Sequence, residues 1–330
     1  MDTGLFELLH TEGQIDDNEL LLIQEKSKQQ LVSVHWDLRT MLYLGILLLS
    51  SGLGILIYKN IDSIGHVTVV AAIGILCTAC FVYCIKKKLP YSNLQVPSPN
   101  LWYDYALLLG CLLMVTFVGY LQFQYHAFGM RWGLATFIPM LGLFFSAYYF
   151  DHKGVLSMAI TSLGAWMGIA VQPEHLINMR WLGNEELVWS GITLGLLLHL
   201  LSVLSLQFNI KAHFAFIYKN FGAHVLFVSL IAAMLVFDNY YFLWFLALAA
   251  VCAYHIREAI RESAFYFFLL ASIYGYVGLS IVVVNSLIKI GRGSDFPASV
   301  IFMYFIASGV GLIIFLISYS KQLKQNDSLQ

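Results

Sequence analysis

The feature that most restricts the fold is a series of apolar segments, each close to the 20 or so helical residues that cross the hydrocarbon core of a bilayer. Ten such segments follow one another, at 41–58, 66–85, 104–123, 132–149, 155–171, 188–208, 224–237, 240–256, 264–287 and 300–319. They predict an all-α fold, a polytopic integral membrane helix bundle of about ten transmembrane helices. The seventh segment is short, and an earlier start near Phe214 would lengthen it.

Composition excludes a soluble protein. Charged residues make up 11% of the 330 residues and hydrophobic residues 59%, whereas a soluble domain carries about 25% charge. The net charge is −1 and the 18 basic residues are scattered, which argues against a nucleic-acid partner. The expected surroundings are therefore the lipid bilayer.

The chain divides into a cytoplasmic N-terminal helical segment (1–38), a transmembrane bundle (39–320) and a short cytoplasmic tail (321–330). Asp16 and Glu19 have the spacing of a capping box, with Ile15 and Leu20 at the positions of a hydrophobic staple. We expect a pair of short helices within residues 3–36, resting on the cytoplasmic face or on a protein partner.

Basic residues in the short loops predict the orientation. With the N-terminus inside, 13 of the 18 lysines and arginines lie in cytoplasmic segments and 5 in outer ones. Both termini are therefore expected in the cytoplasm.

Ionisable side chains at membrane depth are costly, so each is a candidate functional residue. His199 lies near the centre of its segment, either as a substrate- or proton-contacting residue or as a neutral imidazole that hydrogen-bonds the next helix. The neutral, hydrogen-bonding imidazole is the favoured interpretation. A cytoplasmic charged cluster closes the eighth segment and comprises His255, Arg257, Glu258, Arg261 and Glu262. His255 and Glu258 have a spacing found in carboxylate-bridged metal sites, but helical ion pairing explains the cluster without a metal.

Other patterns predict packing rather than chemistry. Glycines spaced by four residues, Gly164 with Gly168 and Gly191 with Gly195, allow helices to approach closely. The five cysteines all fall in apolar segments, as expected of core residues. Gln122 lies near a segment end and is expected at the membrane interface. Phosphate-loop, nucleophile-elbow and zinc-protease motifs are absent from the sequence, so we expect no cofactor and no metal, and an enzyme is the least favoured class.

The first quarter of the chain resembles a bacterial family of predicted membrane proteins, domain of unknown function 2157. The resemblance covers mainly residues 5–85 and rests on the N-terminal run from His10 to Leu20, followed by the Gly-rich stretch from Leu44 to Asn60. It departs at Ile61, where family members commonly have Trp. The family implies a bacterial inner-membrane location and a polytopic bundle, and brings no established activity.

Three functional hypotheses remain. A non-enzymatic scaffold, sensor or partner subunit is favoured. A ten-span small-molecule transporter comes second, because the two five-span halves have nearly equal length, although their loop lengths and motifs do not match as an inverted repeat would require. A membrane-embedded transferase comes third. The sequence names no substrate, partner or oligomeric state.

Overall fold

A computed structural model describes residues 65–171, 185–261, 264–290 and 296–327, with isolated positions in the N-terminal part. The chain divides into two compact units, Met1–Thr68 and Val69–Gln330. In the first unit, the Asp16 N–H donates to Glu19 Oε2 at 3.3 Å, which is one half of a capping box. The remainder of the expected helices within 3–36, and the first apolar segment (41–58), lie outside the described residues.

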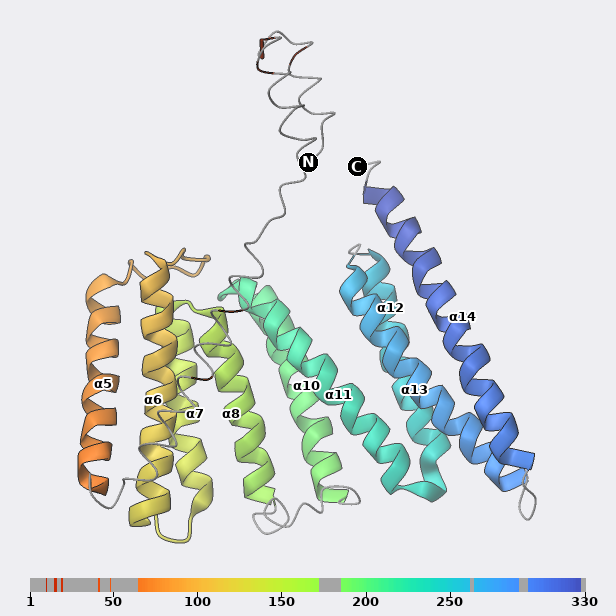
Figure 1. Cartoon of the computed structure of the whole chain (residues 1–330), viewed down its shortest axis with the longest axis horizontal. Helices are drawn as coiled ribbons and strands as arrows, with labels where there is room; N and C mark the ends of the chain where they lie inside the picture. Colours follow the sequence, from red (N-terminus) through yellow and green to blue (C-terminus); the bar gives the residue numbers. More distant parts are fainter. Residues whose placement is uncertain are drawn as a thin grey trace. The chain divides into compact units, whose positions relative to one another are not determined.

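The second unit consists of helices throughout its described part, which confirms the all-α class. The long helices, labelled in Figure 1, are α5 (His66–Lys87), α6 (Leu101–Tyr125), α7 (Trp132–Phe150), α8 (Lys153–Val171), α10 (Glu185–Gln207), α11 (Ala215–Val236), α12 (Tyr241–Arg261), α13 (Phe265–Ile290) and α14 (Phe296–Asp327). Two 3₁₀ turns, Ala212–Phe214 and Asp238–Tyr240, precede α11 and α12. In this described part, eight helical segments are long and apolar enough to cross a membrane.

Two helices extend well beyond the expected segments. Helix α11 begins at Ala215 directly after its 3₁₀ turn, so the seventh segment does start earlier and reaches full length. Helix α14 runs to Asp327 and takes in most of the expected tail at 321–330. Residues 321–325 are good helix formers and no Gly or Pro follows Tyr319, so nothing stops the helix at the end of the apolar run.

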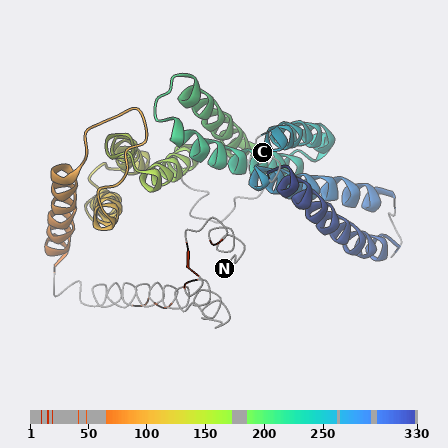
Figure 2. The ribbon, with the colours of Figure 1, turned by 90° about the horizontal axis from the view of Figure 1, so that it is seen from above.

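Close packing of α10 against α11 joins the two hydrophobic cores of the second unit. One core draws mainly on α6, α7 and α8 and the other on α11, α12 and α13, and both include residues of α10 and α11. A Cβ added at Gly195 would lie 2.8 Å from Leu226 Cβ, and one at Gly191 would lie 2.1 Å from Ser229 Oγ. These glycines therefore permit the approach of α10 and α11, which lie side by side in Figure 2.

Gln122 lies in the last turn of α6, near the segment end where the sequence places it. Its side chain is fully buried, donating to Gly129 O at 2.7 Å and accepting from Phe128 N–H at 2.9 Å. The amide closes the turn between α6 and α7, whose backbone groups need partners away from water.

Candidate functional site: a buried histidine pair

Two histidines from different helices meet inside the bundle. His199 Nε2 on α10 lies 3.1 Å from His255 Nε2 on α12. His199 stands eight residues before the end of α10 and His255 six before the end of α12, depths of about 12 and 9 Å at a rise of 1.5 Å per residue. Two residues that the sequence presents as separate features therefore form one site.

The hydrogen-bond partners fix where the protons lie in the neutral pair. His199 Nδ1 lies 2.8 Å from Gly195 O, and a carbonyl only accepts, so Nδ1 carries the hydrogen. A neutral His199 then has a bare Nε2, which accepts from His255 Nε2–H. His255 Nδ1 is consequently a bare acceptor, and it is buried without a hydrogen-bond partner among the described residues. The predicted bond from His199 to the next helix is thus made to its own helix, and the contact across helices is to another histidine.

Aromatic rings and one glycine hold the pair. The His255 side chain is 1% exposed, with its ring 5.4 Å from the ring of Phe227 and 6.0 Å from that of Phe267. A Cβ added at Gly222 would lie 2.8 Å from His199 Nδ1, so only glycine leaves room for this imidazole. No sequence pattern singles out Gly222, because His199, the residue that it contacts, is 23 positions away.

The charged cluster at the end of α12 divides between two faces of the helix. Arg257 and Arg261 are exposed, while Glu258 turns inward with His255, and its Oε1 pairs with Lys219 Nζ of α11 at 2.9 Å. Glu258 Oε2 is buried and has no hydrogen-bond partner in the described part of the chain. Glu262 lies outside the described residues. His255 and Glu258 therefore place hydrogen-bond acceptors on the inner face of α12, whereas Arg257 and Arg261 form an exposed basic face.

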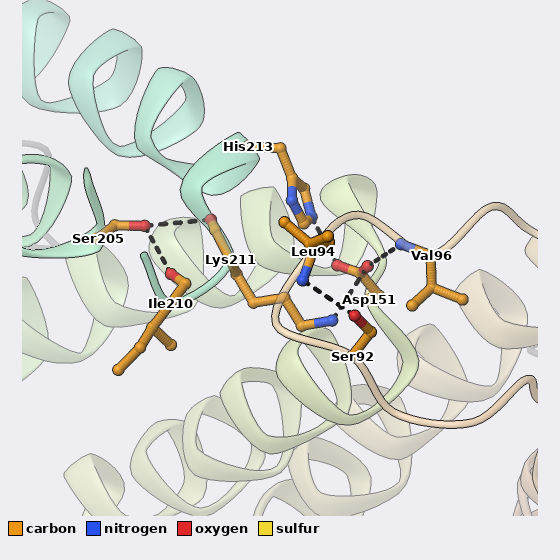
Figure 3. A network of polar contacts seen from close by, with 8 residues as sticks. All are labelled: Ser92, Leu94, Val96, Asp151, Ser205, Ile210, Lys211 and His213. Carbon is orange, nitrogen blue, oxygen red and sulfur yellow. Dashed lines mark hydrogen bonds and ion pairs between the residues drawn. The ribbon is translucent and has the colours of Figure 1, made fainter. Parts of the chain in front are cut away.

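A second polar network lies where three connections meet: residues 88–100, the Asp151–His152 turn and residues 208–214 (Figure 3). We call this end of the bundle the Lys211 end. Asp151 Oδ2 lies 3.0 Å from Lys211 Nζ and accepts from Val96 N–H at 2.6 Å, and its Oδ1 lies 2.6 Å from His213 Nε2. The side chains of Asp151 and Lys211 are 3% and 1% exposed. The Lys211 ammonium is at ion-pair distance but not in hydrogen-bond geometry, and the Tyr91 ring, 4.7 Å away, lies under it.

Both partners of this ion pair have left-handed backbone, with φ of +56° at Asp151 and +51° at Lys211. Asp tolerates this region, whereas Lys adopts it at a cost that Gly would not have. Ser205 Oγ donates to the carbonyls of Ile210 and Lys211 at 2.9 and 3.1 Å, and Lys211 N–H donates to Asn93 O at 3.1 Å. These bonds stabilise the connection in this conformation. The charge that the Lys211 side chain supplies to neutralise Asp151 offsets the cost of its left-handed backbone.

His152 lies beside this network, between two helices. Its Nε2 is 3.5 Å from Asp104 Oδ1, and its Nδ1 accepts from Val155 N–H at 3.2 Å at the start of α8. Burial lowers the pKa of the His152 imidazole, against the opposite effect of Asp104 and Asp151. The neutral form is the one that caps α8, since Nδ1 must keep its lone pair.

A small cavity of about 10 Å³ is lined by Asp151 and Lys211 of the second network. Two others lie away from both networks. One of about 570 Å³ opens between α6, α7 and α8, and one of about 360 Å³ between α11, α13 and α14. Neither is lined by His199, His255 or any charged side chain. Both are apolar hollows suited to hydrocarbon.

The remaining predicted residues have structural positions. Gly164 faces Leu194 of α10, with 3.5 Å from a Cβ added there to Leu194 Cδ2, and Gly168 lies in α8. In the part of the chain that the structure describes, no three His, Cys, Asp or Glu side chains come together as metal ligands.

These features define an integral membrane protein built from apolar helices. Residues 7–156 match a family described as predicted membrane proteins, domain of unknown function 2157, which confirms the resemblance and extends it to the beginning of α8. No curated protein and no solved structure matches the chain. Both members of the histidine pair lie beyond the matched residues.

Proposed function

We propose that the protein is a non-enzymatic sensor of a bacterial inner membrane, with the His199–His255 pair as its sensing element. The carrying observation is that the pair ends at a backbone carbonyl: His199 Nδ1 donates to Gly195 O, next to the close contact of Gly195 with Leu226. A chain of polar groups that stops inside a packed interface is suited to change the packing of α10, and it offers no onward route to a solute.

The separation of the cavities from the pair also supports a sensor. A transporter binds its substrate near the midplane, in a cavity with convergent polar groups. The cavities between α6, α7 and α8 and between α11, α13 and α14 hold neither histidine.

The output of the sensor would run through residues 3–36 to a protein partner. The bond from Asp16 N–H to Glu19 Oε2 is one half of a capping box, which favours a helix start there, and an isolated helix pair of this length is marginal without a docking surface. The bias of basic residues supports a cytoplasmic N-terminus, which would give this segment access to a cytoplasmic partner.

A ten-span small-molecule transporter is the alternative, and the unpartnered His255 Nδ1 is the observation that favours it. An acceptor at about 9 Å depth, inside a helix bundle, could contact a substrate with a hydrogen-bond donor.

Genetics separates the two functions. In a strain whose phenotype depends on this gene, His199→Leu and deletion of residues 2–30 should each reproduce the null phenotype, and the double change should be no worse than either. Immunoblots of membrane fractions must show normal amounts of each variant. If His199→Leu abolishes uptake or export of a solute while the deletion leaves that transport intact, the sensor is wrong and the transporter is supported.

A further inference from the structure

Two of the three buried side-chain atoms without a hydrogen-bond partner in the described residues lie one turn apart on α12: His255 Nδ1 and Glu258 Oε2. Residues three apart on a helix share a face. Both atoms are acceptors, because His255 Nε2 carries the hydrogen of the neutral imidazole and Glu258 is paired with Lys219 as a carboxylate. The group that this face lacks is therefore a hydrogen-bond donor or a positive charge.

Titratable or charged side chains face His255 from three helices, α10, α11 and α12. His199 approaches from α10, Lys219 of α11 pairs with Glu258 beside it, and Tyr254 and Glu258 flank it on α12. On α13 the contact is the ring of Phe267, above which Lys219 Nζ also lies, at 4.6 Å. With both imidazoles neutral the group carries no net charge, since Lys219 and Glu258 cancel.

The charge arrangement selects among ligands. A divalent cation would place two charges beside the Lys219 ammonium, with only Glu258 to compensate, and buried charge without compensation is strongly disfavoured. A single proton adds one charge, which His199 stabilises by accepting a charge-assisted hydrogen bond from His255 Nε2–H. Glu258, three residues further along the same face of α12, carries the opposite charge and would act as its counter-ion.

We propose that the His199–His255 pair is a binding site for one proton, which enters from the Lys211 end and binds at His255 Nδ1. The bond formed is Nδ1–H, the proton comes from solvent, and no other bond breaks. The bound state is an imidazolium on His255, hydrogen-bonded to the neutral imidazole of His199. The Lys219 and Glu258 side chains are 14% and 25% exposed, which gives the proton access from that end. This proposal rests on the proposed function and names the signal as protons on the side of the Lys211 end.

Proton binding would act on the packing of α10. His199 is lodged against Gly222 through Nδ1 and bonded to Gly195 O. An adjacent positive charge strengthens the bond between the two imidazoles and draws α10 and α12 together at this depth. The structural response to the proton would therefore occur at the interface of α10 with α11, where Gly195 and Gly222 permit close packing.

The test is histidine-selective ¹⁵N NMR of the full chain in detergent micelles between pH 4 and 8. Loss of signals in His199→Gln and His255→Gln assigns the pair, and the wild-type titration itself gives the result even if one variant folds poorly. We expect signals from both histidines to move together with a single midpoint. Glu258→Gln should bind the proton roughly tenfold or more weakly, since a neighbouring opposite charge shifts a midpoint by a unit or more. His126→Asn, in the turn after α6 and itself left-handed at φ +50°, should leave the midpoint unchanged.

Three results would overturn the proton site. The signals of the pair stay constant from pH 4 to 8, or they move independently with two separate midpoints, or they respond only when Zn²⁺ is added. None of these contradicts a sensor of another signal. Failure of the proposed function has a different signature: transport of a solute that is lost in His199→Leu and survives the deletion of residues 2–30.

Discussion

Lys211 Nζ lies 3.0 Å from Asp151 Oδ2 across 60 residues of sequence, and both side chains are almost completely buried. The pair ties the connection between α10 and α11 to the turn between α7 and α8, and the Val96 N–H adds the segment that follows α5. A single ion pair thus holds three connections at one end of the bundle.

Removing one partner of this pair should be strongly destabilising. We expect Lys211→Met to lower the free energy of unfolding by about 3–5 kcal/mol, because it leaves the Asp151 carboxylate buried without its counter-charge. Asp104→Asn is the matched control: that carboxylate is 28% exposed, and its loss should cost less than about 1 kcal/mol. Denaturant unfolding in detergent gives both values. Equal effects of the two substitutions would show that the buried pair has no special role.

His152 should make stability fall as the pH falls. Its pKa in the folded chain is below its ordinary value of 6.5 because of burial, so the unfolded chain binds more protons between the two values. The contribution is fully present above about pH 6.5 and is lost as the pH falls toward the folded pKa, below which no further change occurs. His152→Asn keeps a capping acceptor for α8 but does not titrate. Melting temperatures measured from pH 8 to 4 should fall less steeply in this variant, and parallel curves would contradict the prediction.

A methyl group at Gly195 should disturb the contact of α10 with α11. The added Cβ would lie 3.0 Å from backbone atoms of Leu226, which cannot move aside like a side chain, so Gly195→Ala should destabilise by about 1–3 kcal/mol. In Gly309→Ala the new Cβ meets nothing within 4 Å, and that variant should be as stable as wild type or more so. Thermal unfolding of the two variants and the wild type in the same detergent compares their stabilities. A neutral Gly195→Ala would mean that the two helices are less closely packed.

The orientation is testable with reporter fusions. The bias of 13 to 5 in basic residues predicts that a fusion after Gln330 reports the cytoplasm and one within residues 172–187 the outer side. If both fusions reported the same side, the number of crossings between them would have to be even, and the segments would need a different assignment.

The sequence was sufficient for the helices and for half of the histidine pair. Apolar length predicts a crossing helix regardless of its neighbours, and His199 stood out because ionisable residues are rare at that depth. The sequence grouped His255 with the charged residues that follow it and so did not single it out. Whether its side chain points into the bundle depends on which face of α12 packs against α10 and α11. Nothing local indicates a pairing of residues 56 positions apart.

Lys211 and Asp151 were hidden for a different reason. Both lie in connections, where charged side chains are normally solvated. Their burial results from residues 88–100, which cover them, and from left-handed backbone at both positions. Such backbone in a lysine has no sequence signature, since the residues that favour it are Gly, Asn and Asp.

Helix α14 packs on α13 through two hydroxyl pairs, Tyr276 with Ser308 and Ser280 with Tyr304, and through the stacked rings of Phe268 and Tyr319. None of the residues in its membrane-crossing window is buried. During biogenesis this helix leaves the ribosome after α13, which is then already available to receive it. Assembly of the histidine pair therefore does not have to wait for α14, because α10, α11, α12 and α13 all precede it in the chain.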